Sequence, residues 1–441
     1  MQRIQNPERK NWSDILKRPT QELGDIETTV ERIFSEVKSL GDSKLKDYTS
    51  QFDGVQISKI QITAKEIQKA ETQISKELKE AIKMAKANIE AFHQAQQTEK
   101  VDVETMPGIQ CWQEKRPIQK VGLYIPGGTA PLFSTILMLA VPAKIAGCDE
   151  IILCSPPNKE GSVHPAILYT ANLCGATQIF KIGGIQAIAA MTFGTESVPK
   201  VYKIFGPGNQ FVTVAKQIAT KYGVAIDMPA GPSELLVVAD DTANPAFVAS
   251  DLLSQAEHGV DSQVVLVSTS EELIKRTEQE IKAQLALLPR KEIAERAMEN
   301  SKLILVANDR IALDLINEYG PEHYIVCVEN EKFYVENTVN AGSVFIGNYT
   351  PESAGDYASG TNHTLPTNGY AKQYSGVNLD SFMKSMTFQK ITPKGIQGIG
   401  RTIELMAEAE GLQAHKNAVT LRLHTLNEKS SEEDENSNDG Q

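Results

Sequence analysis

The chain has 441 residues, more than one ordinary hydrophobic core accommodates, so we expect two or three domains. Its 44 basic and 56 acidic residues give a formal charge of -12, which argues against a nucleic-acid or anionic-membrane partner and favours a small-molecule ligand. Five cysteines without a C-x-x-C pair argue against a disulfide framework, and the sequence has neither an apolar signal segment nor a membrane-spanning stretch, so we expect a soluble cytoplasmic protein.

The residue pattern predicts helices first and then two sets of βα repeats. After an N-terminal arm over residues 1–24, apolar residues recur at intervals of three and four up to residue 97, which predicts helices. Beyond them, short apolar runs alternate with amphipathic segments, a pattern typical of parallel βαβ units. The runs predicted to be strands are residues 121–125, 150–154, 178–182 and 201–205 in the first set, and residues 235–238, 263–267, 303–306 and 324–328 in the second.

These elements predict an α/β fold with two Rossmann-like parallel-sheet domains, a helical N-terminal arm and a helical C-terminal extension. We expect the first α/β domain to comprise residues 25–123 and 234–377, and the second to comprise residues 124–233. Residues 378–426 are predicted to be a helical C-terminal segment. Residues 427–441 are acidic, rich in Ser and Asn and almost free of apolar side chains, so we expect a disordered tail.

Glycines follow several of the predicted strands, at residues 126–128, 183–184 and 206–209. Such turns at the carboxyl ends of parallel strands commonly face a ligand crevice. None of them is a G-x-G-x-x-G, so the usual dinucleotide fingerprint is absent and tight βα turns without a ligand are the alternative.

One candidate metal motif lies at the end of a predicted helix in the second set. Asn244 and Pro245 suit the start of this helix, and Gly259 suits a left-handed residue just past its end. Gln255 and His258 lie three apart and therefore share one helical face. A carboxamide oxygen and an imidazole nitrogen at this spacing can converge on one cation, and zinc accepts both kinds of atom.

A second motif places a histidine beside a carboxylate after a turn. Gly320 and Pro321 force the turn, so the side chains of Glu322 and His323 need not point to opposite faces as they would within a strand. The motif therefore predicts a general base beside a carboxylate.

Six longer motifs together resemble the histidinol dehydrogenase family, in that family's order, and the resemblance extends to about Leu426. They are Val121-Gly-Leu-Tyr-Ile-Pro-Gly-Gly-Thr-Ala-Pro-Leu, Ile204-Phe-Gly-Pro-Gly-Asn, Asp227-Met-Pro-Ala-Gly-Pro-Ser-Glu, Gly320-Pro-Glu-His, Ser353-Ala-Gly-Asp-Tyr-Ala-Ser-Gly-Thr-Asn-His-Thr-Leu-Pro-Thr and Ala414-His-Lys-Asn-Ala-Val. The resemblance implies the last step of histidine biosynthesis, in which L-histidinol is oxidised through L-histidinal to L-histidine. It also implies that two NAD are reduced and that a zinc ion is required.

The resemblance assigns roles to individual residues of this chain and to the predicted domains. It implies a homodimer with shared active sites, in which the first domain carries the metal and catalytic residues, the second binds the cofactor, and residues 378–426 form the dimerisation segment. The implied metal ligands are Gln255, His258, Asp356 and, from the partner chain, His415. The implied catalytic pair is Glu322 and His323. The resemblance implies substrate contacts for Ser233, His363 and Glu410, and also for the metal ligands and His323. It implies cofactor contacts for Tyr124, Gln186 and Asn209.

The residue chemistry is consistent with such a reaction. Alcohol oxidation by hydride transfer requires removal of the hydroxyl proton, for which His323 is the candidate base. Oxidation of the aldehyde requires a hydrate first, and Glu322 could activate the water. A thiohemiacetal at Cys111, Cys148 or Cys154 is the covalent alternative, although Cys154 lies in an apolar run typical of a buried cysteine. The ligand types are also compatible with manganese or cobalt.

Three other functions fit part of the pattern. A related zinc- and NAD-dependent dehydrogenase of another polar alcohol is disfavoured by His363 and Glu410, which suit an imidazole and an ammonium group. A zinc hydrolase would use Glu322 to activate water and would need no nicotinamide. A non-catalytic metal-binding scaffold is disfavoured because both a base and its neighbouring carboxylate are present.

Overall fold

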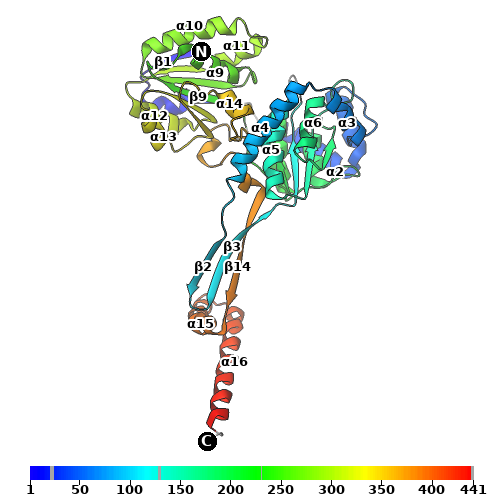
Figure 1. Cartoon of the computed structure of the whole chain (residues 1–441), viewed down its shortest axis with the longest axis vertical. Coiled ribbons are helices and arrows are strands. Elements are labelled where there is room, and N and C mark those ends of the chain that lie inside the picture. The colour runs from blue at the N-terminus through cyan, green and yellow to red at the C-terminus, as the bar shows by residue number, and fades with distance from the viewer. Residues whose placement is uncertain (20–23, 128–130, 230, 439–441) are drawn as a thin grey trace. The chain divides into compact units, whose positions relative to one another are not determined.

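The computed structural model describes residues 1–19, 24–127, 131–229 and 231–438 (Figure 1). Four short segments lie outside these ranges. They are part of the N-terminal arm, part of the first glycine turn, Ala230 and the last three residues of the predicted tail. The chain divides into two compact units. The first consists of residues 1–97 and 117–382, and the second of residues 98–116 and 383–441.

The first unit contains a six-stranded sheet with the order β1-β11-β10-β9-β12-β13. Its strands pair in parallel throughout. They are β1 (Gln2–Gln5), β9 (Glu234–Ala239), β10 (Gln263–Ser268), β11 (Lys302–Leu305), β12 (His323–Cys327) and β13 (Ser343–Ile346).

Alternate residues of these strands face two separate cores. Leu235 and Val237 of β9 lie in one core, while Leu236 and Val238 lie in the other, as the two-residue period of a strand requires. The first core is covered by α9 (Pro245–Ala256), α10 (Glu271–Leu285) and α11 (Lys291–Glu299). The second is covered by α1 (Trp12–Ile15) and by α12 (Asp309–Tyr319) and α13 (Glu331–Asn337), the last two of which are labelled in Figure 1.

A five-stranded sheet with the order β6-β5-β4-β7-β8 is also parallel. Its strands are β4 (Lys120–Tyr124), β5 (Glu150–Cys154), β6 (Gln178–Phe180), β7 (Lys203–Phe205) and β8 (Ala225–Ile226). The accompanying helices are α2 (Gly24–Asp53), α3 (Ala64–Thr72), α4 (Lys76–Gln94), α5 (Phe133–Ala146), α6 (Pro165–Leu173), α7 (Gly184–Phe193) and α8 (Gln210–Lys221). The apolar residues Val30, Phe34 and Val37 of α2 share a core with the sheet, α7 and α8.

The second unit combines a small sheet with two helices. The sheet has the order β14-β3-β2, with strands β2 (Val101–Met106), β3 (Ile109–Pro117) and β14 (Met383–Ile391). Its helices are α15 (Pro393–Ala409) and α16 (Gln413–Asn438), which pack against each other. Thr392 caps α15 and also donates its backbone N–H to Gly108 O over 2.9 Å, which fixes the helix start at the β2–β3 turn.

The structure contains a strand at each of the eight predicted positions and confirms the α/β class. The short elements not yet placed are α14 (Glu352–Tyr357) and the 3-10 turns at Arg9–Asn11, Tyr370–Lys372 and Leu379–Phe382. None of the described helices is both long enough and apolar enough to cross a membrane.

Several predicted segments differ from the structure. The N-terminal arm is not simply helical, because β1 pairs with β11 and extends the six-stranded sheet at its edge. Residues 25–97 pack mainly with the five-stranded sheet, because the apolar face of α2 fits α7 and α8, although Asn88 and His93 also contact residues 358–362. Helix formation in the predicted C-terminal segment begins only at Pro393, since residues 383–391 are strand β14.

The predicted tail also differs from the structure, because α16 continues to Asn438. Adding residues to an existing helix avoids the unfavourable nucleation step, and the Glu and Lys residues after Leu426 are good helix formers. Residues 427–438 are therefore helical in the structure, where composition alone predicted disorder.

Candidate active site

The Glu322-His323 pair lies where α12 turns into β12. Gly320 ends α12 in the left-handed conformation, with φ of 63°, and His323 is the first residue of β12. The parallel register pairs His323 with Leu235 of β9, so the pair lies next to Glu234, the first residue of β9. The predicted turn is confirmed, and it places both side chains at the amino-terminal edge of the six-stranded sheet.

The two ring nitrogens of His323 have different surroundings. Nδ1 lies 3.3 Å from the carbonyl oxygen of Glu234, which can only accept, so this nitrogen carries a proton. Nε2 lies 3.6 Å from Asp356 Oδ1 and, among the described residues, has no hydrogen-bond partner although it is buried. The ring therefore has one anchored nitrogen and one that is available for chemistry.

Three carboxylates, of which Glu322 and Glu352 are buried and Asp356 is partly exposed, influence the charge of His323. Burial lowers the pKa of the ring, but the negative charges of Glu352, Glu322 and Asp356 outweigh burial and raise that pKa to about 10. Glu352 Oε1 lies 3.6 Å and Glu322 Oε2 lies 3.7 Å from Nδ1. The protonation of the ring therefore depends on these carboxylates, and a protonated ring offsets part of their charge.

Glu322 has the properties of a group that exchanges protons near neutral pH. Its Oε2 accepts a hydrogen bond from the backbone N–H of Glu234 over 2.8 Å. Burial raises the pKa of Glu322 to about 8, against the opposing effect of the His323 charge. Burial also raises the pKa of Glu352 well above its usual value, whereas His323 keeps the pKa of Asp356 below its usual value despite burial.

Potential metal-binding atoms gather in this cluster. Among the described residues, one ligand atom each from His323, Glu352 and Asp356 lie within 4.8 Å of one another. His258 is exposed; loss of hydration lowers its pKa, and the Asp356 carboxylate raises it. The pKa of His258 is lowered overall, so the loss of hydration outweighs the effect of the Asp356 carboxylate. Of the predicted ligands, Asp356 belongs to this group of three, and its negative charge also acts on His258.

Gln255 is fully enclosed beside the same cluster. One orientation of the Gln255 amide gives both of its polar atoms a hydrogen bond. In that orientation the amide nitrogen donates to Glu352, and the amide oxygen accepts from the backbone N–H of Glu234 over 3.0 Å. Asn244 and Pro245 begin α9 as predicted, but Gly259 does not take the left-handed conformation, because α9 ends at Ala256 and Glu257 is its right-handed C-cap.

The predicted substrate residues lie in both units. His363 Nδ1 donates to the backbone oxygen of Asp356 over 2.9 Å, so Nε2, 3.3 Å from Thr135 Oγ1, is unprotonated in the neutral ring. Burial lowers the pKa of His363 and favours this neutral form. Ser233 precedes β9. Glu410 and His415 are exposed residues of the second unit, and their part in a site with residues of the first unit stays a prediction.

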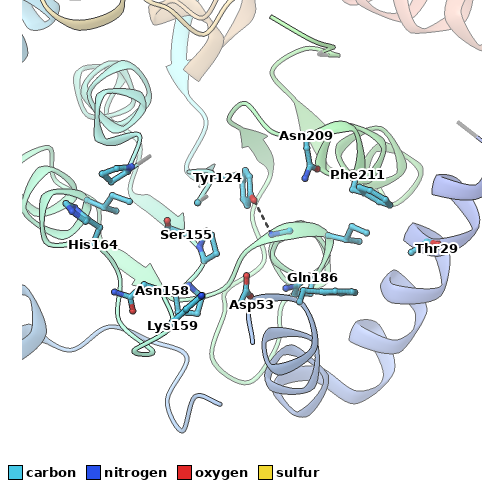
Figure 2. Close-up of a pocket in the computed structure, with 18 residues that line it drawn as sticks. Thr29, Asp53, Tyr124, Ser155, Asn158, Lys159, His164, Gln186, Asn209 and Phe211 are labelled. Atoms are coloured by element: carbon cyan, nitrogen blue, oxygen red, sulfur yellow. Dashed lines mark hydrogen bonds between the residues drawn. The ribbon is translucent and has the colours of Figure 1, made fainter. Parts of the chain in front are cut away.

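A cavity of about 860 Å³ lies at the carboxyl-terminal edge of the five-stranded sheet (Figure 2). The three predicted cofactor residues Tyr124, Gln186 and Asn209 all line it. Tyr124 Oη accepts the backbone N–H of Gly184 over 3.1 Å, and burial raises the pKa of this phenol to about 12. The glycine turn at Gly206 passes so close to Tyr124 that an added Cβ would lie 2.1 Å from its backbone oxygen.

Several polar atoms in this cavity have no partner among the described residues. They are Gln186 Oε1, Ser155 Oγ and Asp53 Oδ2, all buried. Burial raises the pKa of Asp53 to about 6. Buried polar groups are normally hydrogen-bonded, so these atoms indicate a polar ligand.

The structure also accounts for two further histidines and for the cysteines. His93 is buried, with Nδ1 2.8 Å from Ile89 O, and His164 caps α6 and lines the cavity. All five cysteines are free. Burial raises the pKa of Cys148 to about 12 and that of Cys154 further, which disfavours a thiolate nucleophile.

Residue patterns alone missed four groups of the site and cavity. Glu352 could have been found, because Glu352 and Asp356 are four apart and share a helical face. Glu234 ends the motif that begins at Asp227, but nothing in that motif indicates its contacts. Arg18 and Asp53 are single charged residues without a local pattern, and only the fold reveals their positions.

Comparison with known proteins identifies the family. The histidinol dehydrogenase family model matches residues 16–423. A histidinol dehydrogenase of Bacteroides thetaiotaomicron is 61% identical over 426 residues, which cover 97% of this chain and 100% of the relative. One of Haemophilus influenzae is 55% identical, covering 94% of this chain and 96% of the relative. The crystal structure of histidinol dehydrogenase from Elizabethkingia anophelis has 55% sequence identity and a TM-score of 0.95, covering 97% of this chain and 99% of that one. The chain therefore belongs to the histidinol dehydrogenase family of enzymes.

Proposed function

We propose that the chain catalyses the four-electron oxidation of L-histidinol through L-histidinal to L-histidine. Two NAD accept the electrons, and a divalent metal ion is required, for which zinc is the first candidate. This reaction would be the last step of histidine biosynthesis, carried out in the cytoplasm. The observation that carries the proposal is the environment of buried His323. Its Nε2 has no hydrogen-bond partner among the described residues and lies 3.6 Å from Asp356 Oδ1, while its Nδ1 lies 3.7 Å from Glu322 Oε2. A ring nitrogen held in this way suits abstraction of a hydroxyl proton.

We assign the two proton transfers to different residues. In the alcohol step, His323 accepts the hydroxyl proton at Nε2, while Glu234 O holds the proton on Nδ1. In the aldehyde step, Glu322 takes a proton from the water that forms the hydrate, because its pKa of about 8 lets it exchange protons near neutrality. The hydride leaves to the nicotinamide in both steps.

The donor set at the cluster fits a divalent metal. Asp356 supplies an oxygen from the cluster. His258, which is exposed and whose pKa is lowered, would supply a nitrogen, with Gln255 and the partner's His415 as the further proposed ligands. For Gln255 to bind through its oxygen, the amide must leave the N–H of Glu234. When bound, the cation would orient the amino alcohol and offset the carboxylate charge that keeps His323 protonated.

The cavity at the five-stranded sheet fits NAD. It lies at the carboxyl ends of parallel strands, the usual place for a nucleotide in such a sheet. Gln186 and Ser155 offer buried polar atoms that have no partner within the part of the chain that the structure describes. We propose that Tyr124, Gln186 and Asn209 contact the cofactor there.

The first expected result concerns the metal. L-histidinol and NAD should yield two reduced NAD per histidinol, and chelation should abolish turnover while leaving the protein folded, since the α/β cores do not depend on the cluster. Absorbance of reduced NAD measures turnover, circular dichroism monitors the fold, and added zinc should restore activity. Full activity in a chelated sample would refute the metal site.

A second expected result concerns the cavity. Gln186→Ala removes a buried acceptor that lines it, so reduced NAD should bind about tenfold more weakly, as measured by fluorescence titration. Gln217→Ala, an exposed residue of the neighbouring α8, is the matched control and should bind as the wild type does. Equal affinities for all three proteins would place the cofactor elsewhere.

Two rival functions make different predictions. A zinc hydrolase would act on an ester or amide without reducing NAD, so the same absorbance assay separates it. A dehydrogenase for another polar alcohol would reduce NAD but prefer a substrate without an imidazole. The neutral His363 near Asp356 favours histidinol, because its ring nitrogen can bond to another imidazole.

A further inference from the structure

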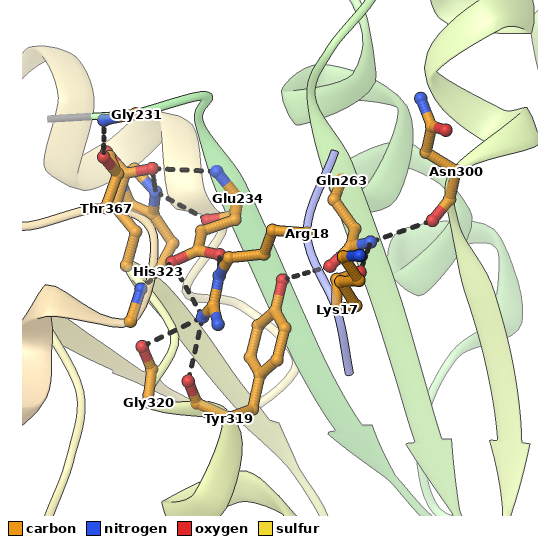
Figure 3. Close-up of polar contacts among 12 residues, drawn as sticks. Lys17, Arg18, Gly231, Glu234, Gln263, Asn300, Tyr319, Gly320, His323 and Thr367 are labelled. Atoms are coloured by element: carbon orange, nitrogen blue, oxygen red, sulfur yellow. Dashed lines mark hydrogen bonds and ion pairs between the residues drawn. The ribbon is translucent and has the colours of Figure 1, made fainter. Parts of the chain in front are cut away.

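Arg18 forms a buried ion pair with Glu234 at the edge of the candidate active site (Figure 3). Its guanidinium engages both carboxylate oxygens, through Nε to Oε2 and through Nη2 to Oε1 over 3.0 Å. The side chain of Arg18 is 13% exposed and that of Glu234 only 1%. Such two-pronged pairing fixes direction as well as distance.

Arg18 also holds the turn that leads to the catalytic pair. Its Nη2 donates to the backbone oxygen of Tyr319 over 2.8 Å and lies 3.4 Å from that of Gly320. The guanidinium carbon lies 3.8 Å from the centre of the Tyr319 ring. One side chain therefore binds the end of α12, immediately before Pro321, Glu322 and His323.

Glu234 connects this ion pair to both members of the catalytic pair. Its backbone N–H donates to Glu322 Oε2 over 2.8 Å, and its backbone oxygen lies 3.3 Å from His323 Nδ1. Arg18 thus fixes the segment that contacts Glu322 and His323 and, independently, the turn that carries them.

We infer that Arg18 is a positioning residue, which sets the geometry of Glu322 and His323 through Glu234 and the α12 turn. The inference rests on the proposed function, in which these two residues transfer protons. The alternative is an ion pair that serves only stability. Buried ion pairs gain little net stability once desolvation is counted, whereas small displacements of catalytic groups cost much in rate.

The test is a set of single variants with a matched control. Arg18→Ala should lower kcat about 10- to 100-fold and change KM for NAD less than twofold, because the cofactor cavity is not touched. Arg18→Lys should recover only part of kcat, since an ammonium group cannot reproduce the forked contact. Arg3→Ala removes another ion pair of the N-terminal segment, with Glu271, and should leave kcat unchanged.

Two further measurements separate positioning from stability. In Arg18→Ala combined with Glu322→Gln, the loss in kcat should fall short of the product of the two single losses. A pocket of about 260 Å³ opens beside Arg18, so added guanidinium should partly restore kcat of Arg18→Ala, whereas uncharged urea should not. If Arg18→Ala does not fold, Glu234→Gln, with kcat as the readout, takes its place in the combined variant.

The outcomes distinguish this inference from the proposed function. Two results would overturn the positioning role while Glu322→Gln remained impaired. One is a wild-type kcat in Arg18→Ala. The other is a combined variant whose loss in kcat equals the product of the single losses, without rescue by guanidinium. Wild-type kcat in Glu322→Gln itself would instead refute the proposed catalytic pair.

Discussion

His323→Asn is expected to lower kcat for histidinol oxidation by about two to four orders of magnitude, the usual contribution of a general base. Asparagine can keep the contact with Glu234 O through its amide nitrogen, but it has no basic atom in place of Nε2. Reduced-NAD binding should be unchanged, because the ring does not line the cofactor cavity. Steady-state kinetics with histidinol, alongside fluorescence titration of the cofactor, measures both quantities.

Glu322→Gln provides the contrast to His323→Asn. It keeps the size of the side chain and an acceptor for the Glu234 N–H but cannot take a proton, so it should impair aldehyde oxidation more than alcohol oxidation. Single turnover with histidinal as the substrate isolates the second step. Equal losses in both steps for both variants would contradict the separate roles of Glu322 and His323.

Activity should return when two inactive variants, His258→Ala and His415→Ala, exchange subunits. In a shared site, each mixed dimer contains one site with all wild-type ligands, so a statistical mixture should recover about a quarter of the wild-type activity. The second unit supports such an assembly, because Leu405, Met406, Leu412 and Leu421 are between 43% and 61% exposed. Turnover is measured after mild dissociation and reassociation.

A different pair of variants serves as the control for subunit exchange. His258→Ala and Asp356→Ala both alter the ligands that we assign to one chain, so their mixed dimers have no intact site and should stay inactive. Verified mixed dimers of His258→Ala and His415→Ala that also stay inactive would show that each site lies within a single chain.

The predictable part of the fold is the part with strong local patterns. Buried strands such as β5 and β10 are short apolar runs, and their positions follow from the sequence. Strand β14 lacks such a pattern, because its residues show no clear apolar alternation, and most of them are exposed in the structure. Which sheet α2 covers depends on the fit of Val30 and Phe34 to distant helices, and no local pattern contains that information.

The candidate site divides in the same way. Glu322, His323 and Asp356 lie in motifs, and the structure brings them into one cluster. Arg18 lies 216 positions from Glu234, so their pairing depends on the long-range packing of the N-terminal segment against β9 and α12. Spacing rules describe neighbours on one element and cannot reveal such a contact.

The helices near the two proposed sites present opposite ends to them, and the two kinds of helix end favour ligands of opposite charge. At the cofactor cavity, α6, α7 and α8 begin, with His164, Gly184 and Asn209 among the lining residues. At the carboxylate cluster, α9 and α12 end, beside Gln255 and Gly320. Helix starts carry partial positive charge and helix ends partial negative charge. The backbone alone therefore favours an anionic dinucleotide at one site and a cation or ammonium group at the other, so that a ligand placed at the wrong site would meet an unfavourable field before any side chain contacts it.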